Sequence, residues 1–420
     1  MRLIYSFAIS IYALGVRMAS PFNEKARQMR DGWRHWQKRL SQFVGQQSQR
    51  QSGRSRTVWF HASSLGEFEQ ARPVLEQFRR SRPDWKVVLT FFSPSGYEVR
   101  KNYDQADLVM YLPIDTRRNA RQFVELLQPD MALFVKYDFW FNYLNELKKR
   151  GTPTLLFSSI FRPGQYFFRW YGAWFARQLQ CYSHIFVQNE ESVRLLAGVG
   201  YRHTTLAGDT RFDRVFDIAA QAKRFEGVER FVGDNPVLMA GSSWEPDESN
   251  IKQFADSYDK PLKIILAPHM IGAGHLNQIE HLMGPEQCLR YSQLVSAEAS
   301  QLNRKVLIID NIGMLSSLYR YATVAYIGGG FGKGIHNILE AAVFGTPVCF
   351  GPNYGKFQEA NDMIACGGAR SYNTAEELSQ LLGRWLDDSN ERKRAAQAAM
   401  KYMEEHRDST AKIMERVEKL

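Results

Sequence analysis

The sequence lacks the motifs of the common hydrolytic sites. It contains no H-E-x-x-H pair, no D-x-D triplet and no G-x-S-x-G turn, so hydrolysis by a metal or by an activated serine has no support in it. Cysteine is scarce and scattered, without a C-x-x-C pair, at the positions Cys181, Cys288, Cys349 and Cys366. This arrangement predicts reduced thiols in a protein that faces the cytoplasm, and it argues against a disulfide framework or a metal site built on cysteine.

The apolar stretch at the amino terminus, Leu3 to Val16, is too short to cross a bilayer, which takes about 20 residues. No small-x-small cleavage site follows it, so a secretory signal peptide is not indicated. The next segment combines arginines and lysines with Trp33 and Trp36, a mixture that suits lipid phosphates and the depth of the headgroups. We therefore expect residues 1–50 to be a membrane-associated helix with a basic segment; the alternative is a core helix of the first domain.

What is present is the composition of a globular protein. The chain has 420 residues, which predicts two domains, and its 44% of hydrophobic and 23% of charged residues exclude a disordered chain. The net charge of +10 favours acidic partners. Its sign alone does not distinguish nucleic acid, anionic lipid and phosphorylated substrates.

After a polar stretch from Gly45 to Arg56, which we expect to be a flexible tether, short apolar runs alternate with amphipathic helical stretches. Six such runs lie in the first half, TVWFHA, KVVLTFFS, DLVMYLP, MALFVK, TPTLLFSS and HIFVQN; five more follow Arg224, PVLMAGSS, LKIILAPH, KVLIID, TVAYIGGG and TPVCFGP. Apolar strands that are each followed by a helix predict parallel sheets covered on both faces. The fold class is therefore α/β, with two tandem Rossmann-like, doubly wound domains at 51–220 and 221–420. Ligands are expected at the carboxyl ends of the strands, in a cleft between the domains.

A glycine-rich loop ends one of the late strands. The segment IGGGFGKGIHNILEAAVFGTPVCFGP, residues 327–352, carries little side-chain bulk before a helix whose expected N-cap is Asn337, so backbone N–H groups can approach a phosphate there. Glu340, three residues later, is placed to bind ribose hydroxyls. The same pair is also a capping-box pattern, and the loop matches neither a Walker loop nor a clean dinucleotide fingerprint. Both a nucleotide site and a simple helix cap stay open.

The segment HASSLGEFEQA, residues 61–71, follows the first predicted strand and carries Glu67. Ser64 and Glu67 have the spacing of a capping box, but Pro73 would kink a helix that began there, so the helix would begin nearer Arg72 and leave Glu67 on a turn. From spacing alone, Glu67 is either a helix cap or a carboxylate at the mouth of a cleft that handles a proton.

Other polar residues also follow predicted strands. His61, the pair Ser242 and Ser243, and His269 lie at strand ends, and Arg211 lies near the domain boundary, where a fixed cation can face a phosphate or a carboxylate. A lone histidine is more often structural than catalytic. Several polar residues at the strand ends of two tandem domains are nevertheless what we expect to line a cleft.

Three segments, WFHASSLGEFEQARPVLEQFR, LAGDTRFDRV and GIHNILEAAVFGTPVCFGPNYGKFQEA, resemble the 3-deoxy-D-manno-octulosonic acid (Kdo) transferases that build the inner core of lipopolysaccharide. The similarity runs in order across nearly the whole chain. It implies the GT-B fold, in which the first Rossmann-like domain binds the acceptor and the second binds the donor, CMP-Kdo.

The resemblance also implies roles for individual residues. Glu67 matches the catalytic base, which would deprotonate a sugar hydroxyl of the lipid A precursor while CMP leaves from the anomeric carbon with inversion. Arg211 stands where the family usually has a lysine that stabilises the transition state. The expected donor contacts are Pro268, His269, Ile312, Gly313, Met314, Asn337, Ile338, Leu339 and Glu340. No metal and no cofactor is expected, because dipoles and cations can hold the departing phosphate.

Two positions depart from the family pattern. In place of M-E-T-E-L-W the chain has VKYDFW, so Lys136 replaces the first glutamate and Asp138 the second. Asp138 keeps a carboxyl group and is counted with Glu67 and Arg211 as catalytic, whereas Lys136 would contact an acceptor phosphate or the Kdo carboxylate. His269 stands where the family has the arginine of P-R-H, so the contacts to the donor phosphate are expected to differ.

Together these inferences predict a Kdo transferase at the cytoplasmic face of the inner (cytoplasmic) membrane, held there by the apolar helix and the basic segment. Its expected partners are CMP-Kdo, the lipid A precursor (lipid IV-A) and the anionic inner leaflet, and nucleic acid is not among them. Two alternatives remain: a GT-B transferase of another nucleotide sugar, and a non-catalytic lipid-binding scaffold on the same fold.

Overall fold

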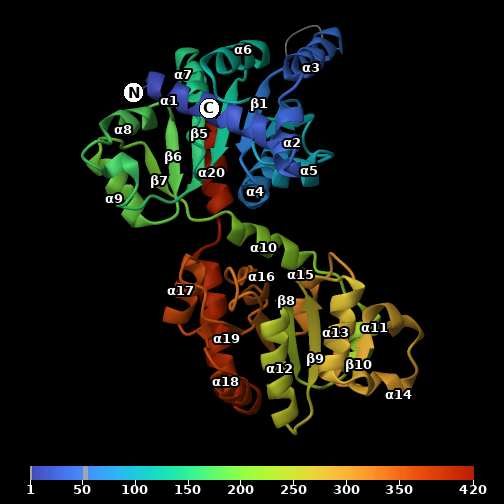
Figure 1. The fold of residues 1–420 in the computed structure, drawn as a ribbon. Helices are drawn as coiled ribbons and strands as arrows, with labels where there is room; N and C mark the ends of the chain where they lie inside the picture. Colours follow the sequence, from blue (N-terminus) through green and yellow to red (C-terminus); the bar gives the residue numbers. More distant parts are fainter. Residues whose placement is uncertain (1, 51–54) are drawn as a thin grey trace. The chain divides into compact units, whose positions relative to one another are not determined.

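The computed structural model describes residues 2–50 and 55–420 and divides the chain into two compact units (Figure 1). The first unit runs to Arg214 and also contains Arg407–Leu420, and the second is Val215–His406. This division differs from the predicted bounds, because the last helix returns to the first unit. There its side chains Ile413, Met414 and Val417 are buried in the hydrophobic core. The amino-terminal helices likewise belong to the first unit.

The first unit is built on a seven-stranded parallel sheet. Its strands are β1 (Thr57–Ala62), β2 (Lys86–Phe91), β3 (Leu108–Tyr111), β4 (Met131–Val135), β5 (Thr154–Ser159), β6 (His184–Val187) and β7 (Thr204–Leu206). Their order across the sheet is β3-β2-β1-β4-β5-β6-β7. The direction of winding therefore reverses between β1 and β4, and ligands of doubly wound folds bind at the carboxyl ends of strands at such a point.

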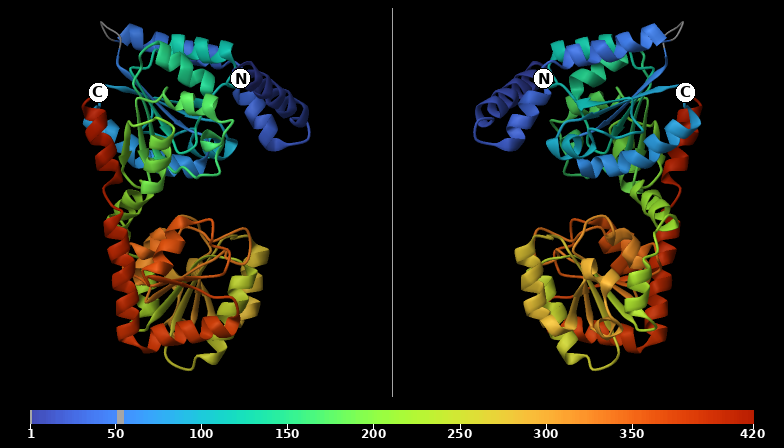
Figure 2. Two further views of the ribbon diagram at one scale, coloured as in Figure 1. Left: turned by 90° about the vertical axis from the view of Figure 1, so that its left-hand side faces the viewer. Right: turned by 90° about the vertical axis from the view of Figure 1, so that its right-hand side faces the viewer.

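Helices flank both faces of this sheet (Figure 2). They are α1 (Arg2–Ala19), α2 (Glu24–Gly32), α3 (Trp36–Arg50), α4 (Leu65–Ser81), α5 (Pro94–Arg100), α6 (Arg117–Leu127), α7 (Phe141–Lys149), α8 (Ala173–Leu179), α9 (Glu190–Gly198) and α20 (Ser409–Glu418). A further helix, α10 (Arg211–Ala220), begins in the first unit and ends in the second.

Strand β1 shows how the sheet divides the core. Successive side chains of a strand point to opposite faces, and accordingly Trp59 packs in one hydrophobic cluster while Val58 and Phe60 pack in another. All three side chains are fully buried. Burial on both faces explains why the predicted strands are apolar throughout instead of alternating with polar residues.

The second unit repeats this plan with a seven-stranded parallel sheet of order β10-β11-β9-β8-β12-β13-β14. Its strands are β8 (Val237–Ser243), β9 (Lys263–Pro268), β10 (Cys288–Arg290), β11 (Val306–Ile308), β12 (Val324–Ile327), β13 (Val348–Phe350) and β14 (Ala369–Ser371). Its helices are α11 (Glu226–Val232), α12 (Glu245–Ser257), α13 (Ala273–Met283), α14 (Ala299–Leu302), α15 (Leu315–Leu318), α16 (Leu339–Ala342), α17 (Gln358–Ala365), α18 (Ala375–Asp387) and α19 (Ser389–Glu405). Here the winding reverses between β8 and β12.

The predicted fold class, two doubly wound α/β domains, is confirmed, and every predicted strand is present. The three strands that the sequence analysis missed, β7, β10 and β14, each have three residues and lie at a sheet edge. Their sequences, TTL, CLR and ARS, contain no continuous apolar run, unlike the equally short β11 and β13, which were predicted. The predicted tether is wrong in part, since α3 continues to Arg50; residues 51–54 of it lie outside the described residues.

Helix α1 packs on the first unit through one face only. The ring of Tyr5 lies 4.9 Å from that of Phe141, and its hydroxyl donates a hydrogen bond to Asp115 (2.6 Å). The large apolar side chains on α1 that stay exposed are Leu3, Ile4, Phe7, Ile11, Tyr12, Leu14 and Met18. Among the residues described, no helix combines the length and the apolar character that crossing a bilayer requires.

Candidate active site

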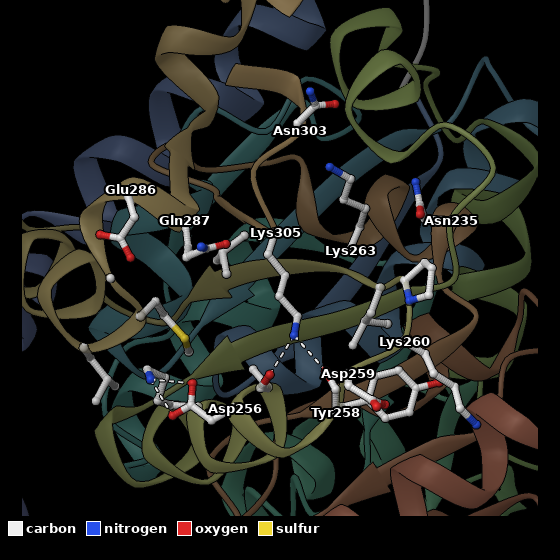
Figure 3. A pocket seen from close by; sticks show the side chains of 18 of the residues that line it. Asn235, Asp256, Tyr258, Asp259, Lys260, Lys263, Glu286, Gln287, Asn303 and Lys305 are labelled. Atoms are coloured by element: carbon white, nitrogen blue, oxygen red, sulfur yellow. Dashed lines mark hydrogen bonds and ion pairs between the residues drawn. The ribbon is translucent and has the colours of Figure 1, made fainter. Parts of the chain in front are cut away.

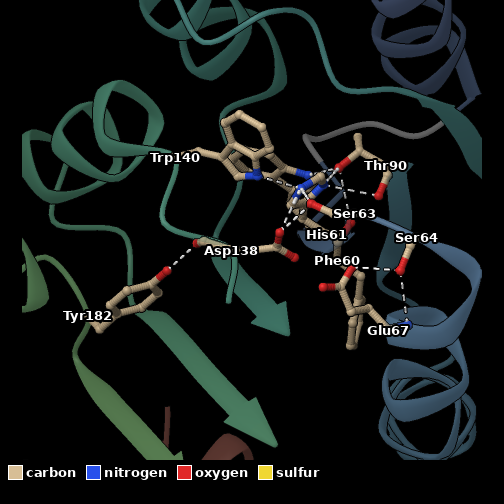
Figure 4. A network of polar contacts seen from close by, with 10 residues as sticks. Phe60, His61, Ser63, Ser64, Glu67, Thr90, Asp138, Trp140 and Tyr182 are labelled. Carbon is tan, nitrogen blue, oxygen red and sulfur yellow. Dashed lines mark hydrogen bonds and ion pairs between the residues drawn. The ribbon is translucent and has the colours of Figure 1, made fainter. Parts of the chain in front are cut away.

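The carboxyl ends of β1 and β4 bring polar residues together at the switch point of the first sheet (Figure 4). Ser63 and Ser64 follow β1 and lead into α4, which carries Glu67. Asp138 follows β4, 75 positions after Ser63, and accepts a hydrogen bond from the Ser63 hydroxyl. Strand pairing thus unites two segments that are far apart in the sequence.

Glu67 lies in the first turn of α4, which begins at Leu65. The N-cap is Ser64, whose hydroxyl accepts a hydrogen bond from the Glu67 N–H (3.4 Å) and donates one to Glu67 Oε2 (2.9 Å). A start of the helix near Arg72 is therefore wrong, and Pro73 lies inside the helix. Glu67 remains partly exposed, so its carboxylate is held at the helix end and still accessible.

His61 lies behind these residues, fully buried and neutral. The indole N–H of Trp140 donates to His61 Nε2 (2.8 Å), and because an indole can only donate, the imidazole proton is on Nδ1. Nδ1 in turn donates to Thr90 Oγ1 (2.8 Å). Burial lowers the pKa of His61 to about 3, so its 3.7 Å approach to Asp138 is not an ion pair. His61 has a structural role here.

Asp138 is almost completely buried, with 3% of its surface exposed. Its Oδ1 accepts the hydrogen bond from Ser63, whereas its Oδ2 has no hydrogen-bond partner in the part of the chain that the structure describes. Burial, and after it the charge of Glu67, raises the pKa of Asp138 well above its ordinary value. The site therefore pairs a neutral carboxylic acid with a more accessible carboxylate, and their different surroundings separate their protonation states.

Arg211 begins α10 and is tied to α4 through Asp209. Its Nε donates to Asp209 Oδ2 (2.9 Å), and its Nη2 also lies 2.9 Å from that oxygen. Gln70, three residues after Glu67 on α4, donates from its amide to both oxygens of Asp209. Burial alone would raise the pKa of Asp209, but Arg211 and these hydrogen bonds hold it below its usual value. The helix that carries Glu67 thus also fixes Arg211.

Lys136 occupies a strained position directly after β4. Its φ is 62°, a left-handed conformation that costs a residue with a side chain roughly 1–2 kcal/mol. Its ammonium lies 5.5 Å from the ring centre of Tyr137, whose hydroxyl accepts a hydrogen bond from Arg162 (3.3 Å). Backbone strain of this kind is common at functional sites, and here it directs a lysine to the strand end that also presents Asp138.

In the second unit the glycine-rich loop follows β12. Gly329 and Gly334 adopt positive φ values of 91° and 133°, which favour glycine. Asn337 accepts a hydrogen bond from the Leu339 N–H (3.2 Å) and donates one to Glu340 Oε1 (3.1 Å). The helix after Asn337 was predicted to be longer; α16 has only four residues, begins at Leu339 and has Ile338 at its N-cap position.

Two residues that were not predicted from the sequence lie beside His269, at the carboxyl ends of the strands of the second sheet. Trp244 follows β8, His336 lies in the glycine-rich loop, and the ring of His269 stacks on both at centroid distances of 4.6 Å. A tryptophan directly after a strand and a histidine within a glycine run were the available signals. We call these three residues the ring stack.

The remaining predicted donor contacts also lie at the carboxyl ends of the strands of the second sheet. Pro268 ends β9, and Ile312, Gly313 and Met314 lie in the loop after the neighbouring strand β11. Ile312 is 85% exposed, whereas Ile338 and Leu339 are buried. The last two side chains belong to the core, so this segment can offer a ligand only Asn337, Glu340 and backbone groups.

A cavity of about 950 Å³ opens at the amino-terminal ends of β9 and β11 in the second sheet (Figure 3). Four lysines line it: Lys252, Lys260, Lys263 and Lys305. Two of their ammonium groups pair with aspartates, and two donate to backbone carbonyl oxygens. Since each of the four lysines has a structural partner, none of these ammonium groups is left over to bind a ligand. The described residues also contain no group of three or more His, Cys, Asp and Glu placed to hold a metal ion.

Comparison with solved structures identifies the architecture. The UDP-GlcNAc 2-epimerase of Neisseria meningitidis, solved with UDP-GlcNAc, superposes with a TM-score of 0.60 over 87% of this chain and 100% of its own, at 16% identity. At this identity the likeness is one of fold alone. The two tandem Rossmann-like domains are those of the GT-B fold, as the sequence resemblance implied.

Comparison with sequences finds similarity to one family. Residues 34–214 match the family described as 3-deoxy-D-manno-octulosonic-acid transferase (kdotransferase). A 3-deoxy-D-manno-octulosonic acid transferase of Rickettsia bellii is 23% identical over 376 residues, which cover 86% of this chain and 85% of the relative. The enzyme of the same name from Haemophilus influenzae is 23% identical over 371 residues, 85% of this chain and 86% of the relative. These matches confirm the resemblance seen in the sequence: over most of its length the chain is similar to 3-deoxy-D-manno-octulosonic acid transferases.

Proposed function

We propose that this protein transfers Kdo from CMP-Kdo to a sugar hydroxyl of a lipid A precursor, lipid IV-A, with inversion at the anomeric carbon. The observation that carries the proposal is the position of Glu67 in a chain similar to this family. Its partly exposed carboxylate stands in the first turn of α4 at the switch point of the first sheet. A sugar hydroxyl is a weak nucleophile until a base accepts its proton, and a carboxylate in hydrogen-bonding reach can serve as that base.

In the proposed reaction the oxygen of the acceptor hydroxyl forms a bond to the anomeric carbon of Kdo. The bond from that carbon to the phosphate oxygen of CMP breaks, and its electron pair leaves with CMP. The hydroxyl proton passes to Glu67, which Ser64 holds through its hydrogen bond to Oε2. A single displacement of this kind inverts the anomeric carbon and needs no covalent intermediate with the protein.

A neutral Asp138 supports this role of Glu67. Two ionised carboxylates in one site oppose each other's charge. Because the buried Asp138 keeps its proton, Glu67 can carry the negative charge that a base requires. Asp138 acts through Glu67 in this scheme, and Arg211 supplies a fixed positive charge that offsets the negative charge of the transition state.

The donor is assigned to the second unit. Asn337 and Glu340 are proposed to hold the ribose, and Pro268 and His269, together with the loop 312–314, to hold the cytosine and the phosphate. A hydrogen bond joins Asn337 and Glu340, so the groups offered to the ribose are oriented before a ligand arrives. No metal and no cofactor takes part in this scheme, and no nucleic acid is a partner.

We further place the protein at the cytoplasmic face of the inner membrane. The exposed apolar side chains of α1 recur at three- and four-residue spacing, which gives the helix an apolar stripe that can enter the headgroup region. Lys25, Arg34 and Lys38 on the following segment are exposed and suit anionic lipid phosphates. A protein held in this way meets a lipid acceptor in the plane of the membrane.

The test compares the wild type with Glu67→Gln in transfer from CMP-Kdo to lipid IV-A. Glutamine keeps an oxygen that accepts the Ser64 hydrogen bond but cannot take the proton. We expect the rate to fall by about 10²- to 10⁴-fold while the melting temperature stays unchanged. A lowered melting temperature with a retained rate would make Glu67 a helix cap only.

The same assay separates the alternatives. Transfer from a UDP-sugar by the wild type, without transfer from CMP-Kdo, would reveal a GT-B transferase of another nucleotide sugar. Binding of lipid IV-A without transfer from any donor would indicate a lipid-binding scaffold.

A further inference from the structure

The three residues of the ring stack follow three different strands of the second sheet and lie in one cluster. Trp244 follows β8, His269 follows β9 and His336 follows β12, the three adjacent strands β9-β8-β12 at the centre of the sheet. The planes of Trp244 and His269 are inclined by 24°, and those of His269 and His336 by 29°. Trp244 and His269 are exposed and His336 is half-buried. The cluster therefore presents two imidazoles at the switch point, where a ligand is expected.

The hydrogen bond of Trp244 determines the protonation of His336. The indole N–H lies 3.4 Å from His336 Nε2 and points to it. Since an indole can only donate, Nε2 carries a lone pair and the ring is neutral. Burial, and after it the charge of His269, lowers the pKa of His336. Two imidazolium rings stacked at 4.6 Å would also repel each other, so the free protein does not hold both in the charged form.

The other charged groups around the ring stack are engaged elsewhere or lie on its margin. On α12, Asp247 accepts hydrogen bonds from a tyrosine hydroxyl and a loop N–H, and Glu248 accepts one from Ser243. Burial raises the pKa of both carboxyl groups. His275 on α13 lies 3.2 Å from Glu248, and the exposed residues Glu245 and Lys333 flank the cluster in the sequence. Within the described residues, no arginine or lysine bonds to the three rings.

We propose that the ring stack binds the phosphate of the donor nucleotide and takes up a proton when it does so. This inference rests on the proposed function, since it takes the ligand to be the phosphate of a cytidine monophosphate ester. Trp244 and His336 are thereby assigned to the donor site together with His269.

The charge of the phosphate couples its binding to the uptake of a proton. An anion within a few ångströms of an imidazole stabilises its protonated form. Where an arginine would bring its charge permanently, the imidazoles acquire theirs from solvent at the moment of binding. Binding therefore weakens as the pH rises, by up to about tenfold per pH unit for one proton.

The experiment is calorimetric titration of the full-length protein with CMP at pH 7.5, in buffers that differ in ionisation enthalpy. The dependence of the measured heat on that enthalpy gives the number of protons taken up. CMP can itself change protonation, since phosphate monoesters have a second pKa near 6. This contribution is the same for all variants, so the comparison is between the wild type and His269→Asn or His336→Asn.

We expect a net uptake of about one proton in the wild type relative to His336→Asn, and a smaller difference for His269→Asn, in which His336 can still take up the proton. His281→Asn, an exposed histidine farther along α13, is the matched control and should keep the uptake. Trp244→Phe keeps an aromatic ring for stacking but frees His336 Nε2. His336 is then protonated more easily before CMP arrives, so CMP should bind more tightly at pH 7.5 and with a weaker dependence on pH.

Equal proton uptake in the wild type and both asparagine variants, with CMP bound, would overturn the inference and leave the proposed function intact. Wild-type affinity for CMP that does not change between pH 6.5 and 8.5 would overturn it without any variant. Binding of UMP in place of CMP would instead contradict the proposed donor.

Discussion

The side-chain amide nitrogen of Gln70 donates to both carboxylate oxygens of Asp209, at 2.9 and 3.0 Å. The two residues are 139 positions apart and both are buried. Asp209 in turn holds the guanidinium of Arg211, and Gln70 lies one turn after Glu67 on α4. The proposed base and the proposed cation therefore share one buried network within the first unit, and a change at Gln70 should reach the chemistry through Arg211.

Replacement of Gln70 by methionine removes the amide and keeps the length of the side chain. Asp209 then loses the hydrogen bonds of this amide nitrogen in a buried site, which we expect to lower the free energy of unfolding by about 1–3 kcal/mol. Arg211 also loses part of its support, so the turnover number should fall by about 10- to 100-fold with little change in the affinity for CMP. Urea unfolding and steady-state kinetics measure the two effects. Gln278→Met, at an exposed position on α13, is the control, and equal kinetics of the two variants would show that the network does not support the reaction.

Asp138 gives a prediction about pH. In the unfolded chain this carboxyl group ionises near pH 4, whereas in the folded protein its pKa is raised. Above pH 4 the folded state therefore binds more protons than the unfolded state, and the stability that Asp138 contributes is lost as the pH rises toward the raised pKa. Asp138→Asn retains an acceptor for Ser63 and removes this loss. Between pH 5 and 8 the wild type should lose stability relative to the variant, by about 1.4 kcal/mol for each unit of the shift that the range covers.

The measurement is urea unfolding of both proteins at several pH values. Asp84→Asn changes an exposed aspartate of the same unit and should follow the wild type. If Asp138→Asn also ran parallel to the wild type, Asp138 would be ionised in the folded protein, and the assignment of the charge to Glu67 would fail.

Lys136 gives a prediction that combines strain and charge. Lys136→Gly relieves the left-handed conformation, so we expect a gain in stability of at most about 1 kcal/mol, because glycine also costs more entropy on folding. Lys136→Glu keeps the strain and reverses the charge. If Lys136 meets an acceptor phosphate or the Kdo carboxylate, this variant should raise the KM of the acceptor or lower the rate by tenfold or more, about 1.4 kcal/mol. Lys148→Glu, exposed on α7, is the control, and unchanged kinetics of Lys136→Glu would exclude the contact.

The sequence was sufficient for the fold and for the outline of the site. Parallel strands buried on both faces are continuous apolar runs, so β1, β4 and β8 could be predicted from the apolar runs alone, whereas the order of the strands in each sheet was not predicted. Glu67 was found because the resemblance and the capping pattern fall on the same residue. These signals are local, and a single sequence carries them.

What escaped prediction depends on contacts between distant segments. Nothing in the sequence near Gln70 indicates that it binds Asp209, and nothing near Asp138 indicates that one of its oxygens is buried without a partner. Whether the carboxyl-terminal segment is a helix that crosses back onto the first domain was left open by the sequence; it does so as α20, because Ile413, Met414 and Val417 fill the core beside α4. The ring stack of Trp244, His269 and His336 likewise exists only because three strands place their ends side by side.

The apolar stripe of α1 gives a prediction about the membrane. Phe7 and Met18 are 67% and 70% exposed, and transfer of one such side chain from water into the bilayer is worth about 1.5–3 kcal/mol. Phe7→Ser or Met18→Ser should therefore weaken the binding of the protein to vesicles of anionic phospholipid by roughly 10- to 100-fold in co-sedimentation. Val99→Ser, 58% exposed on α5, removes an apolar side chain elsewhere and should not change the binding. A salt titration separates the contribution of the basic segment, since exposed charges are screened at high ionic strength.

Vesicle binding that is equal in all three variants and the wild type would show that α1 does not hold the protein at the membrane. A loss of transfer to lipid IV-A in vesicles, with transfer to detergent-dispersed lipid IV-A retained, would assign α1 to delivery of the enzyme to its acceptor, separate from the chemistry at Glu67.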